Sequence, residues 1–112
     1  MAVRLSKPWL ALAAATAKAL SGQLGVYELA NESGEVVYIG AAGGRSLHGL
    51  RGEIQKWVAA PPAGATQFRY EVNMAYRTRQ FELLGAYRHD HGRDPVVNQE
   101  RGELYNGRLR PN

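Results

Sequence analysis

Two tyrosines, each two residues away from a glycine, are the residues of this sequence whose type and spacing most suggest a chemical role. Tyr27 closes the triplet Gly25-Val26-Tyr27, and Tyr38 opens the triplet Tyr38-Ile39-Gly40. A phenol can donate and accept a hydrogen bond. Its pKa of about 10 makes it a poor base at neutral pH unless cationic neighbours or a metal-bound water help it. The ordinary interpretation is that two such tyrosines only stabilise a sheet by packing across strands.

The segments that carry the tyrosines predict a β-hairpin. Residues 24–30 and 35–40 are rich in β-branched and aromatic residues, and a cluster typical of turns, Asn31-Glu32-Ser33-Gly34, separates them. A regular loop of that length pairs Ala30 with Glu35, which places Tyr27 directly opposite Tyr38. A β-bulge in either strand would break this register.

The remaining pattern predicts three helices and one more strand. Apolar residues recur at helical spacing over 7–20 and 46–58, alternate over 67–73, and recur again over 76–91, where Gly92 ends the helix. Residues 96–112 are loop-like with possible short elements. The order predicts an α+β fold with a small, mostly antiparallel three-stranded sheet flanked by helices. We expect a single domain over 1–112, with a helical extension over 1–22, a core over 24–98 and a tail over 99–112.

Composition excludes several classes of protein. The chain has 112 residues and no cysteine, which rules out a disulfide scaffold, a Cys-ligated zinc site and a cysteine nucleophile. Its net charge is +4, and 11 of its 14 basic residues are Arg, whose planar fork suits phosphate. This excess permits a nucleic-acid partner, although a basic pI kept for solubility would explain it equally well.

The N-terminus resembles a secretory signal only superficially. Arg4 and Lys7 precede an apolar run, and Ala17-Lys18-Ala19 imitates a cleavage site. Pro8 at the start of the run, a lysine within the supposed cleavage site and the helical spacing of apolar residues favour a structural helix. No run of about 18 apolar residues is present, so we expect a cytoplasmic protein that does not span a membrane.

The tyrosine triplets and two later features together resemble the GIY-YIG nuclease family. The second triplet matches the signature of that family letter for letter, and the first differs by Val for Ile. Glu82 on a late predicted helix and Pro95-Val96-Val97-Asn98 then follow in the family's order, so the resemblance covers residues 24–98. It implies a GIY-YIG-like fold and a metal-dependent endonuclease that hydrolyses DNA phosphodiester bonds in repair or restriction.

The resemblance also implies roles for single residues. Tyr27 and Tyr38 would act on the attacking water, Glu82 would hold one Mg²⁺ or Mn²⁺, and Asn98 would brace the site. Gly40 would contact the substrate. Apart from the resemblance, Arg77 and Arg79 flank the start of the helix that carries Glu82 and could touch the DNA backbone, although a solvated face explains them equally well. Without the motif, Glu82 is interpreted as a surface carboxylate, because it points away from the large apolar residues of its helix, which are Phe81, Leu83, Leu84 and Tyr87.

The family's arginine has three candidates, because this stretch departs from the usual pattern. Arg51 lies at the edge of the apolar arc of the helix over 46–58, where it would be half-buried and held in place, as a catalytic arginine should be. Arg45 could reach phosphate from the loop before that helix, and His48 is nearest to the usual register. We favour Arg51, with a solvated helix face as the ordinary interpretation of all three.

Two functional hypotheses therefore remain open. The first is the endonuclease, with DNA as substrate. The second is a catalytically weak or inactive module of the same fold that binds nucleic acid or a protein. A small structural or secreted protein with chance matches is a weaker third. No helix-turn-helix or zinc finger is recognisable, so a protein partner or a homodimer would have to supply targeting.

Overall fold

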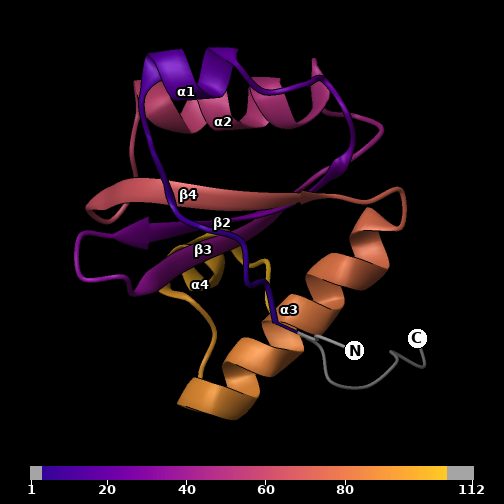
Figure 1. The fold of residues 1–112 in the computed structure, drawn as a ribbon. Helices are drawn as coiled ribbons and strands as arrows, with labels where there is room; N and C mark the ends of the chain where they lie inside the picture. Colours follow the sequence, from indigo (N-terminus) through magenta and orange to yellow (C-terminus); the bar gives the residue numbers. More distant parts are fainter. Residues whose placement is uncertain (1–3, 106–112) are drawn as a thin grey trace.

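A four-stranded antiparallel sheet carries both tyrosines (Figure 1). The computed structural model describes residues 4–105. The strands lie in the order β1-β4-β2-β3, with bounds β1 (Leu10–Ala11), β2 (Gly25–Asn31), β3 (Val36–Ala42) and β4 (Ala65–Val72). The predicted α+β class is confirmed, but the predicted three-stranded sheet is wrong by one strand, because β1 adds to the free edge of β4.

Helices cover the two faces of the sheet (Figure 1). The described residues form α1 (Ala14–Lys18), α2 (Gly49–Ala59), α3 (Tyr76–His91) and α4 (Val96–Arg101). The pair α1 and α2 lies on one face, α3 crosses the other, and α4 contacts the edge strand β3. The predicted helix over 76–91 is confirmed at both ends, and α4 lies in the segment predicted as loop-like. None of the helices within residues 4–105 has the length and apolar character needed to cross a bilayer.

The helix predicted over 7–20 is wrong. Leu10 pairs with Phe68 on β4, and the Leu12 N–H donates to the Thr66 carbonyl oxygen at 3.0 Å, so this part of the chain is an edge strand. Pro8 disfavours helical geometry at the residue before it. The alanine run that follows forms only the short helix α1, because residues in the first half of the segment pair with β4 as strand β1. The predicted extension over 1–22 and tail over 99–112 lie partly outside the described residues.

The predicted hairpin register is also wrong. Tyr27 pairs with Gly40 and Leu29 pairs with Tyr38, and the register shifts between Leu29 and Ala30. The turn accounts for one residue of the difference, because Asn31 Oδ1 accepts hydrogen bonds from the Ser33 and Glu35 N–H groups and Val36 comes to lie opposite Ala30. The bulge after Leu29 accounts for the other. The two tyrosines are consequently diagonal neighbours on one face, with ring centroids 5.9 Å apart.

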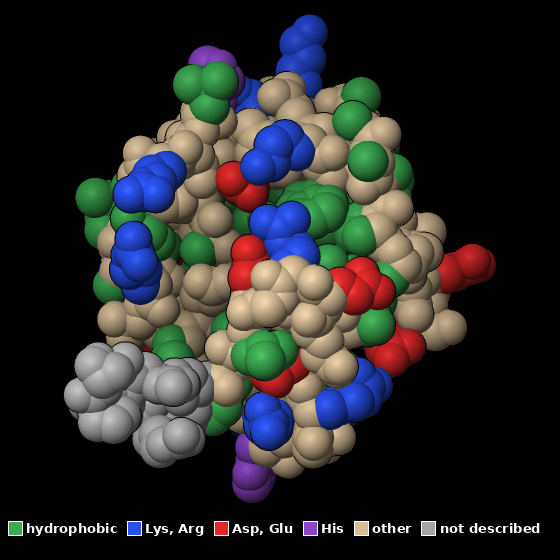
Figure 2. Space-filling model, turned by 180° about the vertical axis from the view of Figure 1, so that it is seen from behind, with side chains coloured by type: hydrophobic (Ala, Val, Ile, Leu, Met, Phe, Trp, Pro, Cys, Tyr) green, Lys and Arg blue, Asp and Glu red, His purple; other side chains and the backbone are tan. Residues whose placement is uncertain are grey.

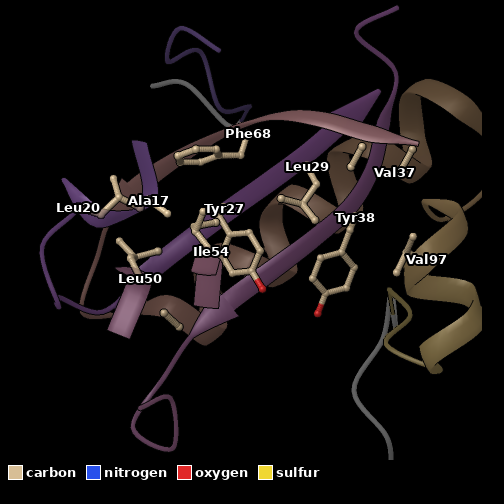
Figure 3. Close-up of a cluster of buried hydrophobic side chains, with 12 residues drawn as sticks. Ala17, Leu20, Tyr27, Leu29, Val37, Tyr38, Leu50, Ile54, Phe68 and Val97 are labelled. Atoms are coloured by element: carbon tan, nitrogen blue, oxygen red, sulfur yellow. The ribbon is translucent and has the colours of Figure 1, made fainter. Parts of the chain in front are cut away.

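Alternate residues of the central strand β2 enter two separate cores. Tyr27 and Leu29 face α1 and α2, where Leu50 and Ile54 are fully buried (Figure 3). Val26 faces α3 and belongs to the second core, whose other buried members are Leu5, Ile39, Leu83, Leu84 and Tyr87. This alternation fixes which side chains reach the α2 side of the sheet, where the candidate site lies.

A buried ion pair lies on the α3 side of the sheet. The Glu28 carboxylate is 7% exposed and accepts from Arg69 Nε at 2.8 Å, and the Arg69 guanidinium lies 4.1 Å from the centroid of the Trp9 ring. Burial raises the pKa of Glu28 above its ordinary value of 4.5, although Arg69 opposes the rise. The pair therefore makes the stability of the fold depend on pH.

Replacing Arg69→Met should reveal this dependence. A carboxyl whose pKa is raised on folding stabilises the fold below its unfolded pKa and loses that contribution as pH rises. Without Arg69 the loss grows, so we expect the variant to be about 3 kcal/mol less stable than the parent at neutral pH. Urea unfolding should show a smaller difference below pH 4.5, where Glu28 is protonated in both states. The exposed Arg93→Met is the matched control, and an equal loss at both pH values would contradict the assignment.

Candidate functional site

The Tyr27 hydroxyl is held inside the protein by two partners. Tyr27 is fully buried, its hydroxyl donates to Glu53 Oε1 at 2.8 Å, and it accepts from Trp57 Nε1–H at 2.8 Å. Burial, with the neighbouring Tyr38 and Glu53, raises the pKa of Tyr27 well above its ordinary value. Tyr27 is therefore held as a neutral phenol at neutral pH.

Glu53 on α2 links this tyrosine to the loop that precedes the helix. Its second oxygen accepts from Ser46 Oγ at 2.9 Å, and Ser46 Oγ in turn accepts from the Gly43 N–H at 3.0 Å. Lys56 Nζ approaches the same carboxylate at 3.5 Å. Sequence reasoning missed Glu53. The available signal was its position one helical turn before Trp57, which puts the two on one face of the helix.

Tyr38 has an equivalent partner from the other end of the chain. Its hydroxyl donates to Glu103 Oε1 at 2.5 Å, and burial followed by this hydrogen bond raises the pKa of Tyr38. The Tyr38 and Trp57 rings are 5.1 Å apart, and the Arg101 guanidinium lies 5.5 Å and 5.3 Å from their centroids. Both phenol rings point the same way from β2 and β3 (Figure 3). Arg101 and Glu103 were also missed, because their sequence neighbourhood carries no signal.

A cavity of about 410 Å³ opens beside Tyr38, and we call it the tyrosine cleft. A second cavity adjoins it at the loop before α2 and includes Arg45. Basic and acidic side chains are interspersed on this side of the molecule (Figure 2). Within residues 4–105, Arg45 and Arg77 form no ion pair, so both guanidinium groups are free to contact an anion. The tyrosine cleft is lined mainly by Tyr38, Glu53, Lys56, Arg77, Gln80, Arg101 and Glu103.

Gly40 leaves room for both rings. A Cβ at this position would lie 2.5 Å from Tyr38 Cε2 and 2.6 Å from the Tyr27 hydroxyl oxygen. Any side chain would therefore push the tyrosines apart. Gly40 therefore packs beneath the two rings. The substrate contact expected of it stays a prediction.

Asn98 closes the outer edge of β3. It is fully buried, its Oδ1 accepts from the Ile39 N–H at 2.9 Å, and its Nδ2 donates to the Ile39 carbonyl oxygen at 3.0 Å. The same Nδ2 donates to the Glu103 carbonyl oxygen at 3.1 Å. The amide thus imitates a neighbouring strand and fixes the segment that presents Arg101 and Glu103. This placement suits the bracing role expected from sequence.

The predicted arginine does not join the tyrosines. Arg51 Nη1 donates to the Leu20 carbonyl oxygen at 3.3 Å, so the side chain packs against the segment after α1. Glu53, about 160° away around the helix, takes the side that faces the tyrosines. His48 is exposed at the start of α2 with φ of 66°, and Arg45 is exposed at the adjoining cavity.

Glu82 and Arg79 also lie away from the tyrosine cleft. Glu82 is 47% exposed and pairs with Arg79 Nη1 at 3.2 Å. Arg79 is buried and holds Glu71 at 2.9 Å, so its guanidinium is closed to a phosphate. No group of three or more His, Asp or Glu side chains within residues 4–105 could hold a metal ion. The resemblance implied Glu82 as a single carboxylate ligand, and in this structure that carboxylate is paired with Arg79.

Comparison with known proteins yields one match. The family described as "domain of unknown function (DUF7508)" matches residues 3–90, which include both tyrosines, Glu53 and Glu82. Asn98, Arg101 and Glu103 lie beyond the matched range. No curated protein matches the chain, and no solved structure does.

Replacing Asn98→Ala should open the edge of β3. The Ile39 N–H and carbonyl would lose their partner inside the protein, so we expect a loss of about 3 kcal/mol in the free energy of unfolding. Amide hydrogen exchange followed by NMR should show Ile39 becoming unprotected while Val26 in β2 stays protected. Continued protection of Ile39 in a folded variant would contradict the strand-like role of Asn98.

Proposed function

The chain belongs to the DUF7508 family, and we propose that it is a nucleic-acid-binding module that grips phosphates around the tyrosine cleft without hydrolysing them. The observation that carries this proposal is the position of Glu53. On the side of α2 that faces the two tyrosines, a carboxylate takes the place expected for an arginine, and Arg51 is turned to the other side. The resemblance to GIY-YIG nucleases supports nucleic acid as the ligand.

Phosphate binding rests on the cations around the tyrosine cleft. Arg45, Lys56, Arg77 and Arg101 line it or the adjoining cavity, against the two carboxylates of Glu53 and Glu103. Arg45 and Arg77 are exposed and have no carboxylate partner within residues 4–105, so they can form charge-assisted hydrogen bonds to phosphate oxygens at little cost. The overall charge of +4 adds a weak attraction for a polyanion.

The side chains to which the resemblance assigns hydrolysis are not placed to perform it. Attack on a phosphodiester requires an activated water and a neutraliser for the developing charge. Both tyrosines are held protonated, and Glu82 is paired with Arg79 on another part of α3. The negative Glu53 would also repel a phosphate brought against Tyr27.

The endonuclease is the second candidate. Tyr27, Tyr38, Gly40 and Asn98 lie together at one place, as the resemblance to that family implies. Cleavage by this chain would depend on Mg²⁺ or Mn²⁺. The carboxylates of Glu53 and Glu103, which accept hydrogen bonds from the two tyrosines, would then take the part expected of Glu82.

Removing the two free guanidinium groups should weaken binding. We expect Arg45→Gln/Arg77→Gln to lower affinity for DNA about tenfold and to reduce the slope of log affinity against log salt by about 2. Fluorescence anisotropy across a salt series measures both quantities. Lys18→Gln/Arg93→Gln is the matched control, because it also removes two exposed positive charges and neither residue lines the tyrosine cleft or the adjoining cavity. Equal weakening by both variants would show that net charge alone is responsible.

A cleavage assay separates the two candidates. Labelled duplex, single strand, flap and four-way junction are incubated with the protein and Mg²⁺, then Mn²⁺. We expect each DNA to be bound and to remain intact, with Glu82→Ala indistinguishable from the parent. Cleavage that Glu82→Ala, Glu53→Gln or Glu103→Gln abolishes would overturn the binding-only proposal and establish the endonuclease.

A further inference from the structure

We propose that the cavity adjoining the tyrosine cleft receives a phosphate at the end of a nucleic-acid strand, and that Tyr76 distinguishes this terminal phosphate from the phosphates within the strand. The inference rests on the proposed function, because the rest of the strand would lie on the cations around the tyrosine cleft. It goes further by naming the part of the nucleic acid that this cavity takes and the residue that selects it.

The cavity lies between the loop before α2 and the first turns of α3. Its volume is about 490 Å³. Residues 43–46 line one side, and Tyr76, Arg77 and Gln80 line the other. The loop and the helix are therefore the two elements that would hold a ligand here.

The carboxylate at this cavity is already engaged by other groups. Glu103 also contributes to the lining, and it accepts hydrogen bonds from the Tyr38 hydroxyl and from Arg101 Nε. Because Arg101 balances its charge, Glu103 does not cancel the positive charges on the loop and on α3. Ser46 Oγ is likewise engaged, since it accepts from the Gly43 N–H at 3.0 Å.

Three donor groups at the cavity remain available to a ligand. Arg45 and Arg77 are exposed, and neither forms an ion pair within residues 4–105. The Tyr76 hydroxyl oxygen accepts from the Gly44 N–H at 3.1 Å, and its own hydrogen has no acceptor in the described part of the chain. Two positive charges and one hydroxyl donor make this cavity suitable for an anion.

The loop and α3 hold Tyr76 in place. A Cβ at Gly43 would lie 2.6 Å from Tyr76 Cε1, so the ring packs directly on the loop backbone. The hydrogen bond from Gly44 ties the other end of the ring to the same loop. The Arg77 guanidinium carbon lies 6.0 Å from the centroid of the ring. The hydroxyl is consequently fixed in position before a ligand arrives.

A terminal phosphate matches these donors better than a phosphate within a strand. A phosphomonoester carries a charge of about −1.5 to −2 at neutral pH and presents three strong acceptor oxygens. A phosphodiester carries a single negative charge and presents two unbridged oxygens. The two guanidinium groups and the Tyr76 hydroxyl provide one donor group for each oxygen of the monoester and balance its charge. A phosphodiester would leave one of the three donors unused.

The test compares oligothymidine strands that differ at their ends. One carries a 5′-phosphate and one a 3′-phosphate. A third ends in hydroxyls and is lengthened until its total charge equals that of the others. Each strand carries its fluorophore on an internal base, so anisotropy measures affinity with both ends free. We expect at least one phosphorylated strand to bind about tenfold more tightly than the hydroxyl-ended strand of equal charge.

The variant Tyr76→Phe tests the selecting residue. It keeps the ring against Gly43 and removes only the hydroxyl. We expect the tenfold preference to fall to about twofold, while affinity for the hydroxyl-ended strand stays the same. Tyr70→Phe is the matched control, because Tyr70 is also half-buried and lines a different cavity.

Each alternative outcome is decisive. Equal affinity for all three strands, with the salt dependence intact, would overturn the terminal-phosphate site and leave the proposed function standing. A preference that Tyr76→Phe leaves at its parent value would overturn the assignment to Tyr76. Failure to bind any strand would overturn the proposed function as well. The three strands are compared on the parent protein, so that result does not depend on the folding of a variant.

Discussion

Burial of the Tyr27 hydroxyl is the constraint on which the rest of this site depends. A hydroxyl with no exposed surface must find hydrogen-bond partners inside the protein, and here they are the Glu53 carboxylate and the Trp57 indole N–H. Both partners come from one face of α2, so the bond sets the rotation of that helix against the sheet. Through Ser46 it also fixes the loop that carries Arg45. The buried Tyr27 hydroxyl thus fixes the positions of the Glu53 carboxylate, the Trp57 ring and the loop that carries Arg45.

The edge strand β3 imposes a second requirement. Its outer backbone groups at Ile39 have no strand beside them, and Asn98 supplies both hydrogen bonds that a strand would make. Gln80 adds a third contact to the Ile39 carbonyl at 3.2 Å. Because Asn98 also holds the Glu103 backbone, closing this edge brings Arg101 and Glu103 over Tyr38. The C-terminal part of the described chain is therefore built into the tyrosine cleft.

The structural features that depend on local sequence pattern could be predicted from the sequence. The α+β class, the two tyrosine strands and α3 up to Gly92 follow from periodicity and turn residues. The failures have tertiary causes. The turn moved the pairing of the two tyrosine strands by one residue and the bulge after Leu29 moved it by another, so Tyr27 pairs with Gly40. Strand β1 exists only because β4 offers an edge. Arg51 and Glu53 flank the apolar face of α2 from opposite sides, and packing against the segment after α1 decided which of them faces the tyrosines.

Binding of nucleic acid around the tyrosine cleft is the central proposal for this protein. The most direct measurement is an NMR titration with a short single strand, following backbone amides and the two indole N–H signals. The account predicts shifts of the Trp57 indole and of amides near Arg45, Arg77 and Arg101, with the Trp9 indole and α1 unmoved. Shifts centred instead on the cavity between the N-terminal segment and β4, at Lys7 and Tyr70, would contradict it.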